Sequence, residues 1–196
     1  MAKIKTTENN SKRDSIIEHA SKLFKEKGYK AASMRELAAR VGVEAASLYN
    51  HIDSKEDLLN AICMNVANRY TCHISDLEKQ AGPVINKIEK LLRFHVLEMM
   101  DNYEEVYVTD HDWRNMDEPH LSEYREMRRH YRRRFAAIVQ QGVDNKEIKT
   151  VDANSAVMIF INAIGAVDQW HRIVHKVNRK DLEENIITIL VDGIRN

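Results

Sequence analysis

Apolar residues recur every three or four positions along most of this chain, the spacing that places them on one face of an α-helix. The pattern predicts long helices over residues 11–27, 54–80, 83–102, 119–141, 152–175 and 181–195, and a shorter helix that ends near Asn115. The apolar run Val106–Thr109 is too short and isolated to be a strand, and residues 1–10 are unpatterned, which is typical of a mobile arm. The sequence therefore predicts an all-α fold.

The stretch from Ser33 to Leu59 has a pattern of its own, with two short helices followed by the start of a third. Ser33 and Glu36 form an S-x-x-E capping box that opens the first short helix. Gly42 ends this helix, because glycine tolerates the left-handed conformation that a sharp stop needs.

The second short helix spans residues 44–52 and turns Leu48 and Ile52 inward. Ser54 with Asp57 then forms another capping box at the head of the long helix that follows. Two helices set at an angle by a glycine-containing turn are typical of a helix-turn-helix, whose second helix enters the major groove of DNA. An ordinary helical hairpin is the alternative, but it gives no role to the donors Tyr49, His51 and Lys55.

This stretch resembles the DNA-binding segment of the TetR family of transcriptional regulators. The matching residues are Gly28-Tyr29, Ser33–Ala38, Gly42-Val43, Leu48–His51 and Ser54–Leu59. The resemblance covers about the first third of the chain, and Ile52 stands where the family usually has phenylalanine.

The resemblance implies which side chains meet DNA. It makes Tyr49, His51 and Lys55 phosphate contacts and places Ala45, Ala46 and Ser47 nearest the base edges. The full predicted DNA-binding set is Ser33, Met34, Arg35, Ala45, Ala46, Ser47, Tyr49, Asn50, His51 and Lys55. Since alanine offers only apolar contact, specificity is expected to depend on Arg35 and on DNA shape.

Charge is distributed unevenly although the net charge is zero. Residues 1–55 hold 11 Lys/Arg against 7 Asp/Glu, a balance of +4, which leaves 19 against 23, or −4, for the remainder. A basic end on an acidic body suits a protein that presents one end to phosphates. We therefore expect a DNA-binding domain over residues 1–55 and a ligand-binding and dimerisation domain over residues 56–196.

The last two predicted helices, 152–175 and 181–195, are apolar on more than one face, which indicates burial on several sides. The family resemblance implies that two helices from each subunit form a four-helix interface. A homodimer would read a two-fold-symmetric operator on double-stranded DNA. The alternative is a large monomeric core with these helices at its centre.

The helix after Pro119 carries Tyr124, Arg128, Tyr131 and Phe135 on one face. Aromatic rings with an arginine among them suit an anionic, partly apolar small-molecule effector. The resemblance implies an effector pocket in the C-terminal helices, and residues 110–135 also resemble regulators that respond to acyl-coenzyme A. The predicted ligand-binding set is His95, Tyr103, Tyr107, Trp113, Arg114, Tyr124, Arg128, Tyr131, Phe135, Asn162 and Trp170. In the alternative interpretation the arginines form a solvated face paired with glutamates, and the aromatics are core.

Composition limits the class of protein. With 43% hydrophobic and 31% charged residues and two prolines, the chain is typical of a helix-rich globular protein. It lacks both an apolar run of the ~20 residues needed to span a membrane and the apolar segment of a secretory signal. Cys63 and Cys72 are expected to be reduced core thiols, since nine positions along one helix separate them too far for a disulfide. A cytoplasmic protein is expected.

Catalytic signatures are missing from the sequence. It has no glycine-rich phosphate loop and no nucleophile elbow, and the histidine pair His171 and His175 has no third ligand at a telling spacing. We expect no catalytic residue, metal or cofactor. The alternative is an all-α small-molecule-binding protein or enzyme that does not act on DNA. The sequence favours a ligand-responsive transcriptional repressor that a small molecule releases from its operator.

Overall fold

The computed structural model describes residues 2–173 and 177–196, with side chains from Lys12 onward. The described residues are helical apart from turns and one isolated bridge between Ile148 and Arg195, which confirms the all-α prediction. The chain divides into two compact units, one made of Met1–Ala67 with Glu104–Tyr124 and the other of Asn68–Tyr103 with Arg125–Asn196. Unit 1 thus includes a segment that follows the predicted domain boundary at residue 55.

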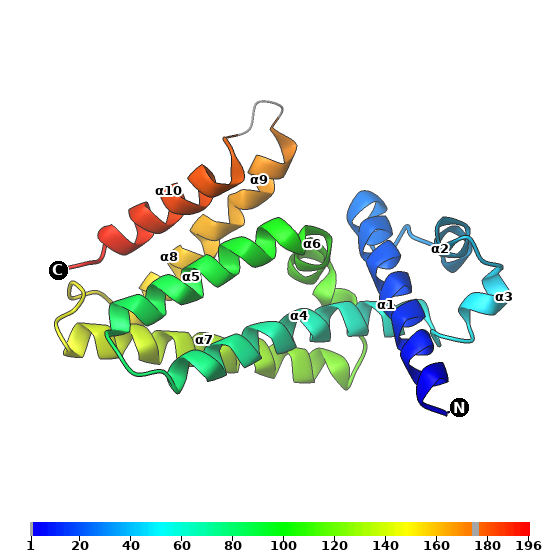
Figure 1. Cartoon of the computed structure of the whole chain (residues 1–196), viewed down its shortest axis with the longest axis horizontal. Coiled ribbons are helices and arrows are strands. Elements are labelled where there is room, and N and C mark those ends of the chain that lie inside the picture. The colour runs from blue at the N-terminus through cyan, green and yellow to red at the C-terminus, as the bar shows by residue number, and fades with distance from the viewer. Residues whose placement is uncertain (1, 174–176) are drawn as a thin grey trace. The chain divides into compact units, whose positions relative to one another are not determined.

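Unit 1 contains the predicted helix-turn-helix (Figure 1). Its elements are α1 (Ala2–Lys27), α2 (Met34–Val41), α3 (Ala45–Leu48), the start of α4 (Lys55–Glu78), nearly all of α6 (Tyr103–Asp112), the 3-10 helix η1 (Trp113–Asn115) and the start of α7 (His120–Asp144). One hydrophobic cluster contains buried side chains from α1, α2, α3, α4 and α6. Met116, which follows η1, and Tyr124 of α7 belong to the same cluster. Trp113 and Leu121 pack against its edge. The short helices therefore depend on this shared core rather than on their own stability.

Unit 2 contains the remainder of α4 and α7 together with α5 (Val84–Asp101), α8 (Ala153–Gly165), α9 (Val167–Arg172) and α10 (Arg179–Asp192). Helix α5 lies against α8, α9 and α10 (Figure 1). It buries residues on more than one face, among them Ile88, Leu91 and Val96, which are fully inaccessible. A helix buried in this way is the centre of its unit.

The first helix begins at Ala2, so the prediction of an unpatterned arm over residues 1–10 is wrong for the backbone from Ala2 onward. The segment contains lysine, glutamate and alanine and lacks glycine and proline. Because these residues favour or tolerate a helix, the periodic helix that starts near Ser11 can extend backwards without an apolar stripe.

Helix α7 continues through Gly142 to Asp144, beyond the predicted end at residue 141. A Cβ atom at Gly142 would lie 3.3 Å from the Ile148 side chain and 3.4 Å from a Val84 methyl. The glycine therefore permits close packing, and the helix turns away afterwards, where Lys146 has a φ of 60°.

The predicted helix over residues 152–175 is two helices. Asp152 caps α8 as expected, by accepting a hydrogen bond from the Ser155 amide at 2.7 Å. The helix then breaks after Gly165, where the Ala166 amide donates a hydrogen bond to the Ala163 carbonyl, three residues back instead of the four of an α-helix. Residues 174–176, including His175, lie outside the described part of the chain.

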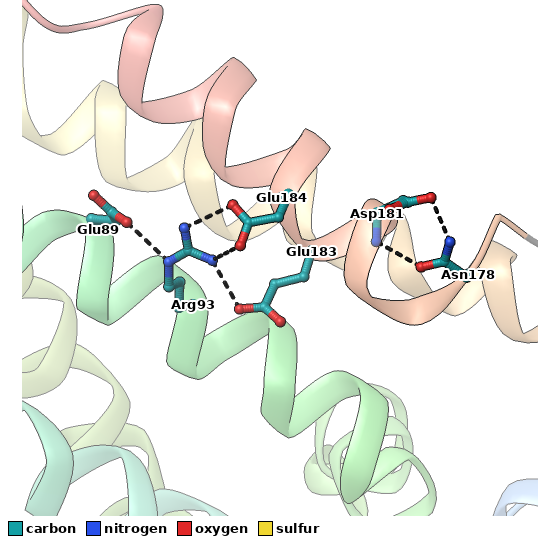
Figure 2. Close-up of polar contacts among 6 residues, drawn as sticks. All are labelled: Glu89, Arg93, Asn178, Asp181, Glu183 and Glu184. Atoms are coloured by element: carbon teal, nitrogen blue, oxygen red, sulfur yellow. Dashed lines mark hydrogen bonds and ion pairs between the residues drawn. The ribbon is translucent and has the colours of Figure 1, made fainter.

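Helix α10 begins two residues before the predicted Asp181, at Arg179. Asn178 caps it by accepting a hydrogen bond from the Asp181 amide at 2.9 Å, as Figure 2 shows. The start was misplaced because asparagine and aspartate are both good caps, and the spacing alone does not choose between them.

Candidate nucleic-acid interface and effector residues

The predicted capping chemistry positions α2. Ser33 Oγ accepts a hydrogen bond from the Glu36 amide at 3.2 Å, and Gly42 adopts the left-handed conformation at φ 78°. The Asp57 amide likewise donates to Ser54 Oγ at 2.9 Å at the start of α4. Both capping boxes and the glycine stop are therefore confirmed.

Helix α3 is shorter than predicted, but it has the predicted inner and outer faces. Leu48 and Ile52 are buried in the core of unit 1. The outward residues are Ala45, Ala46, Ser47, Tyr49 and Asn50, all of them exposed. Tyr49 is 52% exposed, which is unusual for an aromatic ring that has no contact function.

The start of α2 adds an available cation to this surface. Ser33 and Arg35 are exposed, and within the described part of the chain the Arg35 side chain forms no ion pair or hydrogen bond. Its neighbour Arg40 is engaged, since it pairs with Glu26 at 2.6 Å. Arg35 is thus free to meet an external anion.

Three predicted DNA contacts are less accessible. Met34, His51 and Lys55 are half-buried, and His51 Nδ1 is buried without a hydrogen-bond partner among the described residues. The Lys55 ammonium donates to the carbonyls of Tyr29, Lys30 and Ala32 at 3.1, 3.4 and 3.2 Å. The phosphate contacts expected of His51 and Lys55 stay predictions.

Tyr29 joins several elements of unit 1. Its hydroxyl donates to Glu56 Oε1 at 3.1 Å, and its amide donates to Asp112 Oδ2 at 3.3 Å. Burial and the Glu56 carboxylate raise the pKa of Tyr29, so the phenol stays protonated at physiological pH. Burial also raises the pKa of Asp112. No spacing in the sequence predicts the contact between Tyr29 and Asp112, because the two residues lie 83 positions apart in the chain.

Three predicted effector residues come together in unit 2. His95 Nε2 lies 2.7 Å from the Tyr131 hydroxyl, and the His95 and Phe135 rings stack at 6.2 Å. Tyr70 and Phe160 extend the same aromatic cluster. Burial lowers the pKa of His95 to about 3 and raises the pKa of Tyr131, so this hydrogen-bonded pair is neutral at physiological pH.

Three other predicted effector residues of unit 2, Tyr103, Asn162 and Trp170, lie elsewhere in it. Tyr103 donates a hydrogen bond to Asp168 and stacks on His171 at 3.7 Å. Burial and the hydrogen bond to Asp168 raise the pKa of Tyr103 to about 12. Trp170 Nε1 donates to the Val177 carbonyl at 2.8 Å, and Asn162 is exposed.

Four predicted effector residues belong to unit 1, whereas Arg128 belongs to unit 2 and lies on α7, three positions before Tyr131. Tyr107 stacks on His111 at 4.1 Å, Arg114 lies over the Trp113 ring at 4.6 Å, and Trp113 lies 5.8 Å from Tyr124. The predicted set is therefore divided between the two units, and only its His95 group forms a single buried cluster.

The arginine run of α7 is largely a solvated surface. Arg129 and Arg133 both pair with Glu126, at 2.7 and 2.8 Å, and Arg134 pairs with Glu78 at 2.6 Å. The two pairs with Glu126 are exposed and contribute little to stability, whereas the Arg134 side chain is only 17% exposed. The alternative interpretation, a solvated face paired with glutamates, therefore describes Arg129 and Arg133. Arg128 is half-buried, and its ligand role stays a prediction.

Arg93 is a structural centre that sequence analysis missed. As Figure 2 shows, its guanidinium contacts Glu89 at 2.9 Å, Glu183 at 3.0 Å and Glu184 at 2.9 Å. Two of these partners are on α10, some ninety residues away in the sequence, so no local signal could find them.

Two further predictions concern thiols and metals. Neither Cys63 nor Cys72 forms a disulfide, but only Cys63 is buried, so the expectation of a core position is wrong for Cys72. Within the described residues no three His, Cys, Asp or Glu side chains are grouped to hold a metal. None of the described helices is both long and apolar enough to cross a membrane.

Comparison with known proteins gives matches over both parts of the chain. Residues 16–62 match "Bacterial regulatory proteins, tetR family", and residues 81–194 match "Tetracyclin repressor-like, C-terminal domain". The HTH-type transcriptional repressor KstR2 of Mycobacterium tuberculosis is 19% identical over 187 residues, which cover 94% of each chain.

Solved structures share the fold. The ketosteroid transcriptional regulator KstR2 of M. tuberculosis superposes with a TM-score of 0.87 at 17% identity, over 95% of this chain and 96% of that one. AibR, solved with isovaleryl coenzyme A and operator DNA, gives a TM-score of 0.80 at 20% identity, over 92% and 98%. The chain therefore belongs to the tetR family of bacterial regulatory proteins and is a DNA-binding transcriptional repressor.

Proposed function

We propose that this repressor works in the cytoplasm as a homodimer and that an acyl-coenzyme A thioester releases it from its operator. DNA contact is assigned to the start of α2 and the outer face of α3. The observation that carries this assignment is the exposure of Tyr49 and Arg35, two large side chains with contact chemistry and no role in the core of unit 1.

Each exposed residue suits a different part of the contact. Tyr49 and Ser33 can donate hydroxyl hydrogen bonds to phosphates, which fix the register of the protein on DNA. Ala45 and Ala46 are limited to apolar contact with a thymine methyl group. Base choice then falls to Arg35 and to the deformability of the operator.

Dimerisation is supported by the apolar surface that α8 and α10 expose. Met158 and Ile159 on α8 are 59% and 57% exposed, and Ile189 on α10 is 71% exposed. Large apolar side chains clustered on two helices are typical of an interface. Two copies joined there would present two reading heads to a two-fold operator.

The effector class is supported by residue chemistry and by one relative. Arg128 and Tyr131 are on the same helix one turn apart, so a cation lies next to the neutral aromatic cluster of His95. A charged phosphate portion and an apolar acyl portion would meet these two environments. AibR was solved with isovaleryl coenzyme A, a compound of that class.

Operator binding is tested by fluorescence anisotropy with DNA from upstream of the protein's own gene, with a scrambled duplex of equal length as control. We expect tighter binding to the upstream fragment. Equal affinity for both duplexes at physiological salt would contradict the assignment of a specific operator there.

Effector class is tested on the same complex by adding acyl-coenzyme A thioesters of increasing chain length. Coenzyme A alone and the free carboxylic acids are the controls. We expect release by a thioester and weaker release by either half. Release by the free acid alone would keep a ligand-responsive repressor but exclude a thioester effector.

The dimer interface is tested by Ile189→Glu, with Ile173→Glu as control. Both side chains are exposed, but Ile173 lies outside α8 and α10. Sedimentation should find monomers for I189E and dimers for I173E and the wild type. A dimeric I189E variant would move the interface elsewhere.

A further inference from the structure

The two halves of helix α10 are held in unit 2 by different kinds of contact. In the C-terminal half, Ile187 and Val191 are 3% and 2% exposed. In the N-terminal half, residues 179–186, no side chain is buried, although Leu182 and Ile186 are half-buried. The first two turns of α10 therefore depend more than the rest on polar contacts with α5.

Arg93 of α5 makes three of those polar contacts (Figure 2). Its two terminal nitrogens donate to the two carboxylate oxygens of Glu184 at 2.9 and 3.0 Å, and one of them also donates to Glu183 at 3.0 Å. Glu89, one turn earlier on α5, accepts from Arg93 Nε at 2.9 Å and so orients the guanidinium from its own helix. Only a planar guanidinium can hold a carboxylate in this two-pronged geometry, which a lysine ammonium does not reproduce.

A second ion pair joins the same half of α10 to α5, but it is more exposed. Arg179 donates to Asp101 at 2.6 Å, and each of these side chains is 48% exposed. The Arg93 and Glu183 side chains are 28% and 18% exposed. Because water screens exposed pairs more strongly, we expect Arg93 to contribute more than Arg179 to the position of α10.

The Arg93 cluster, which consists of Arg93, Glu89, Glu183 and Glu184, holds three carboxylates and one guanidinium. Without Arg93, the two carboxylates of α10 would face the carboxylate of Glu89 with no guanidinium between them, and like charges repel. Leaving the largely covered Glu183 carboxylate unpaired is also unfavourable. Loss of Arg93 should therefore move the first turns of α10 away from α5.

Helix α10 turns its opposite side to solvent. Glu183 and Glu184 precede the buried Ile187 by four and three positions, so all three lie towards the same face of the helix. Ile189 is two positions beyond Ile187, about 200° further around a helix of 3.6 residues per turn, and it is 71% exposed. The Arg93 cluster is thus on one side of α10, and the apolar surface assigned to the dimer is on the other.

We propose that Arg93 is a positioning residue for self-association, which holds the N-terminal half of α10 on α5 and thereby aligns the Ile189 face for a second copy of the chain. The inference rests on the proposed homodimer and deepens it. In an interface built from α8 and α10 of two copies, α10 meets its partner along its length. A helix fixed only at its C-terminal end would have to be ordered on association, and that ordering weakens the dimer.

The test uses Arg93→Met and Arg93→Lys in the full-length chain, with Lys90→Met as a matched control. Lys90 is exposed on the same helix and donates to Gln80, so its loss removes a charge from α5 without removing a contact to α10. Sedimentation equilibrium measures the dissociation constant of the dimer. We expect R93M to raise it by about tenfold, at the lower end for hydrogen bonds between charged groups because the cluster is partly exposed. R93K should have an intermediate effect and K90M none.

Rescue separates the action on α10 from a general loss of stability. Replacing both Glu183 and Glu184 by glutamine in the R93M background removes the repulsion between α10 and Glu89. The triple variant should therefore dimerise more tightly than R93M alone. Dimerisation as weak as that of R93M, or weaker, would contradict an action through these two carboxylates.

Hydrogen exchange reports the position of α10 apart from dimerisation when both proteins compared are monomers. The Ile189→Glu variant, expected to be monomeric, supplies that background. Exchange of the amides of residues 182–186 should be faster in I189E/R93M than in I189E. The amides around Leu91, in the buried part of α5, show whether each variant is folded, and R93K replaces R93M in the comparison if they lose protection.

The outcomes distinguish this inference from the proposed interface. A monomeric wild type, or a dimeric I189E variant, would overturn the proposed interface and the role of Arg93 with it. A dimeric wild type and a monomeric I189E variant, together with a wild-type dissociation constant for R93M, would overturn the role of Arg93 alone.

Discussion

The proposed DNA-contacting surface draws all of its residues from positions 33–50, whereas the aromatic cluster around His95 draws on α4, α5, α7 and α8, from Tyr70 to Phe160. The first is exposed and is shaped by caps and turns. The second is buried and is shaped by packing between distant segments. Side chains of the exposed DNA-contacting surface can be replaced at little cost in stability, whereas side chains of the buried His95 cluster cannot. Operator specificity and effector specificity are therefore under different constraints.

The largest expected effect tests this difference with a matched pair. Phe135→Ala removes a ring with no exposed surface from the cluster and should lower the free energy of unfolding by about 3–5 kcal/mol. Tyr49→Ala removes an exposed ring and should change stability by less than about 0.5 kcal/mol while weakening operator binding. Urea unfolding and anisotropy measure the two quantities. Similar losses of stability in both variants would break the comparison.

How far the sequence predicts each region follows from the same difference. The capping boxes of Ser33 and Ser54 and the stop at Gly42 are local, so spacing alone found them. The Arg93 contacts to α10 and the bond between His95 and Tyr131 join distant segments, and no spacing rule reveals such pairs.

Lys55 shows that even a local motif leaves the side-chain direction open. Its place beside the recognition helix and its charge both favoured a phosphate contact, yet its ammonium lies on backbone carbonyls of the preceding turn. Gly142 is a similar case, because it follows the predicted helix end at residue 141, yet its role is set by Ile148 and Val84, which pack against it.

The next effect in size is a pH dependence confined to the buried cluster. Burial lowers the pKa of His95 to about 3 from 6.5, so below pH 6.5 the unfolded chain binds a proton that the folded chain does not. The free energy of unfolding should therefore fall as pH drops from 6.5 towards 3, by about 1.4 kcal/mol for each pH unit. The stability from His95 is fully present above pH 6.5.

His95→Gln isolates this contribution, since glutamine can still hydrogen-bond Tyr131 but does not titrate. Urea unfolding between pH 7 and pH 4.5 should show a shallower decline for H95Q than for the wild type. His130→Gln, at an exposed position of the same unit, should leave the decline unchanged. Parallel curves for wild type and H95Q would mean that His95 is accessible to protons in the folded protein.

A smaller effect is expected from the contact surface itself. Arg35→Ala removes an exposed cation with no partner among the described residues, so stability should hardly change. If Arg35 reads a base, its loss should cost about 1–3 kcal/mol of binding to the operator and less with random DNA. Competition anisotropy with both duplexes measures the ratio. An equal loss with each duplex would assign Arg35 to phosphate instead.

The smallest effect contrasts a glycine in each unit. Gly42 has a φ of 78°, so Gly42→Ala should cost about 1 kcal/mol of stability in unit 1 by straining the stop of α2. Gly165, in α8, has no positive φ and open space around its Cβ position, so Gly165→Ala should stabilise unit 2 by up to about 1 kcal/mol. Thermal unfolding of the two variants measures both shifts. Opposite signs would mean that the backbone conformation at Gly42 restricts which residue can stand there, although the side chains of the neighbouring DNA-contacting surface can change. A neutral G42A variant would show that the stop of α2 tolerates any small residue.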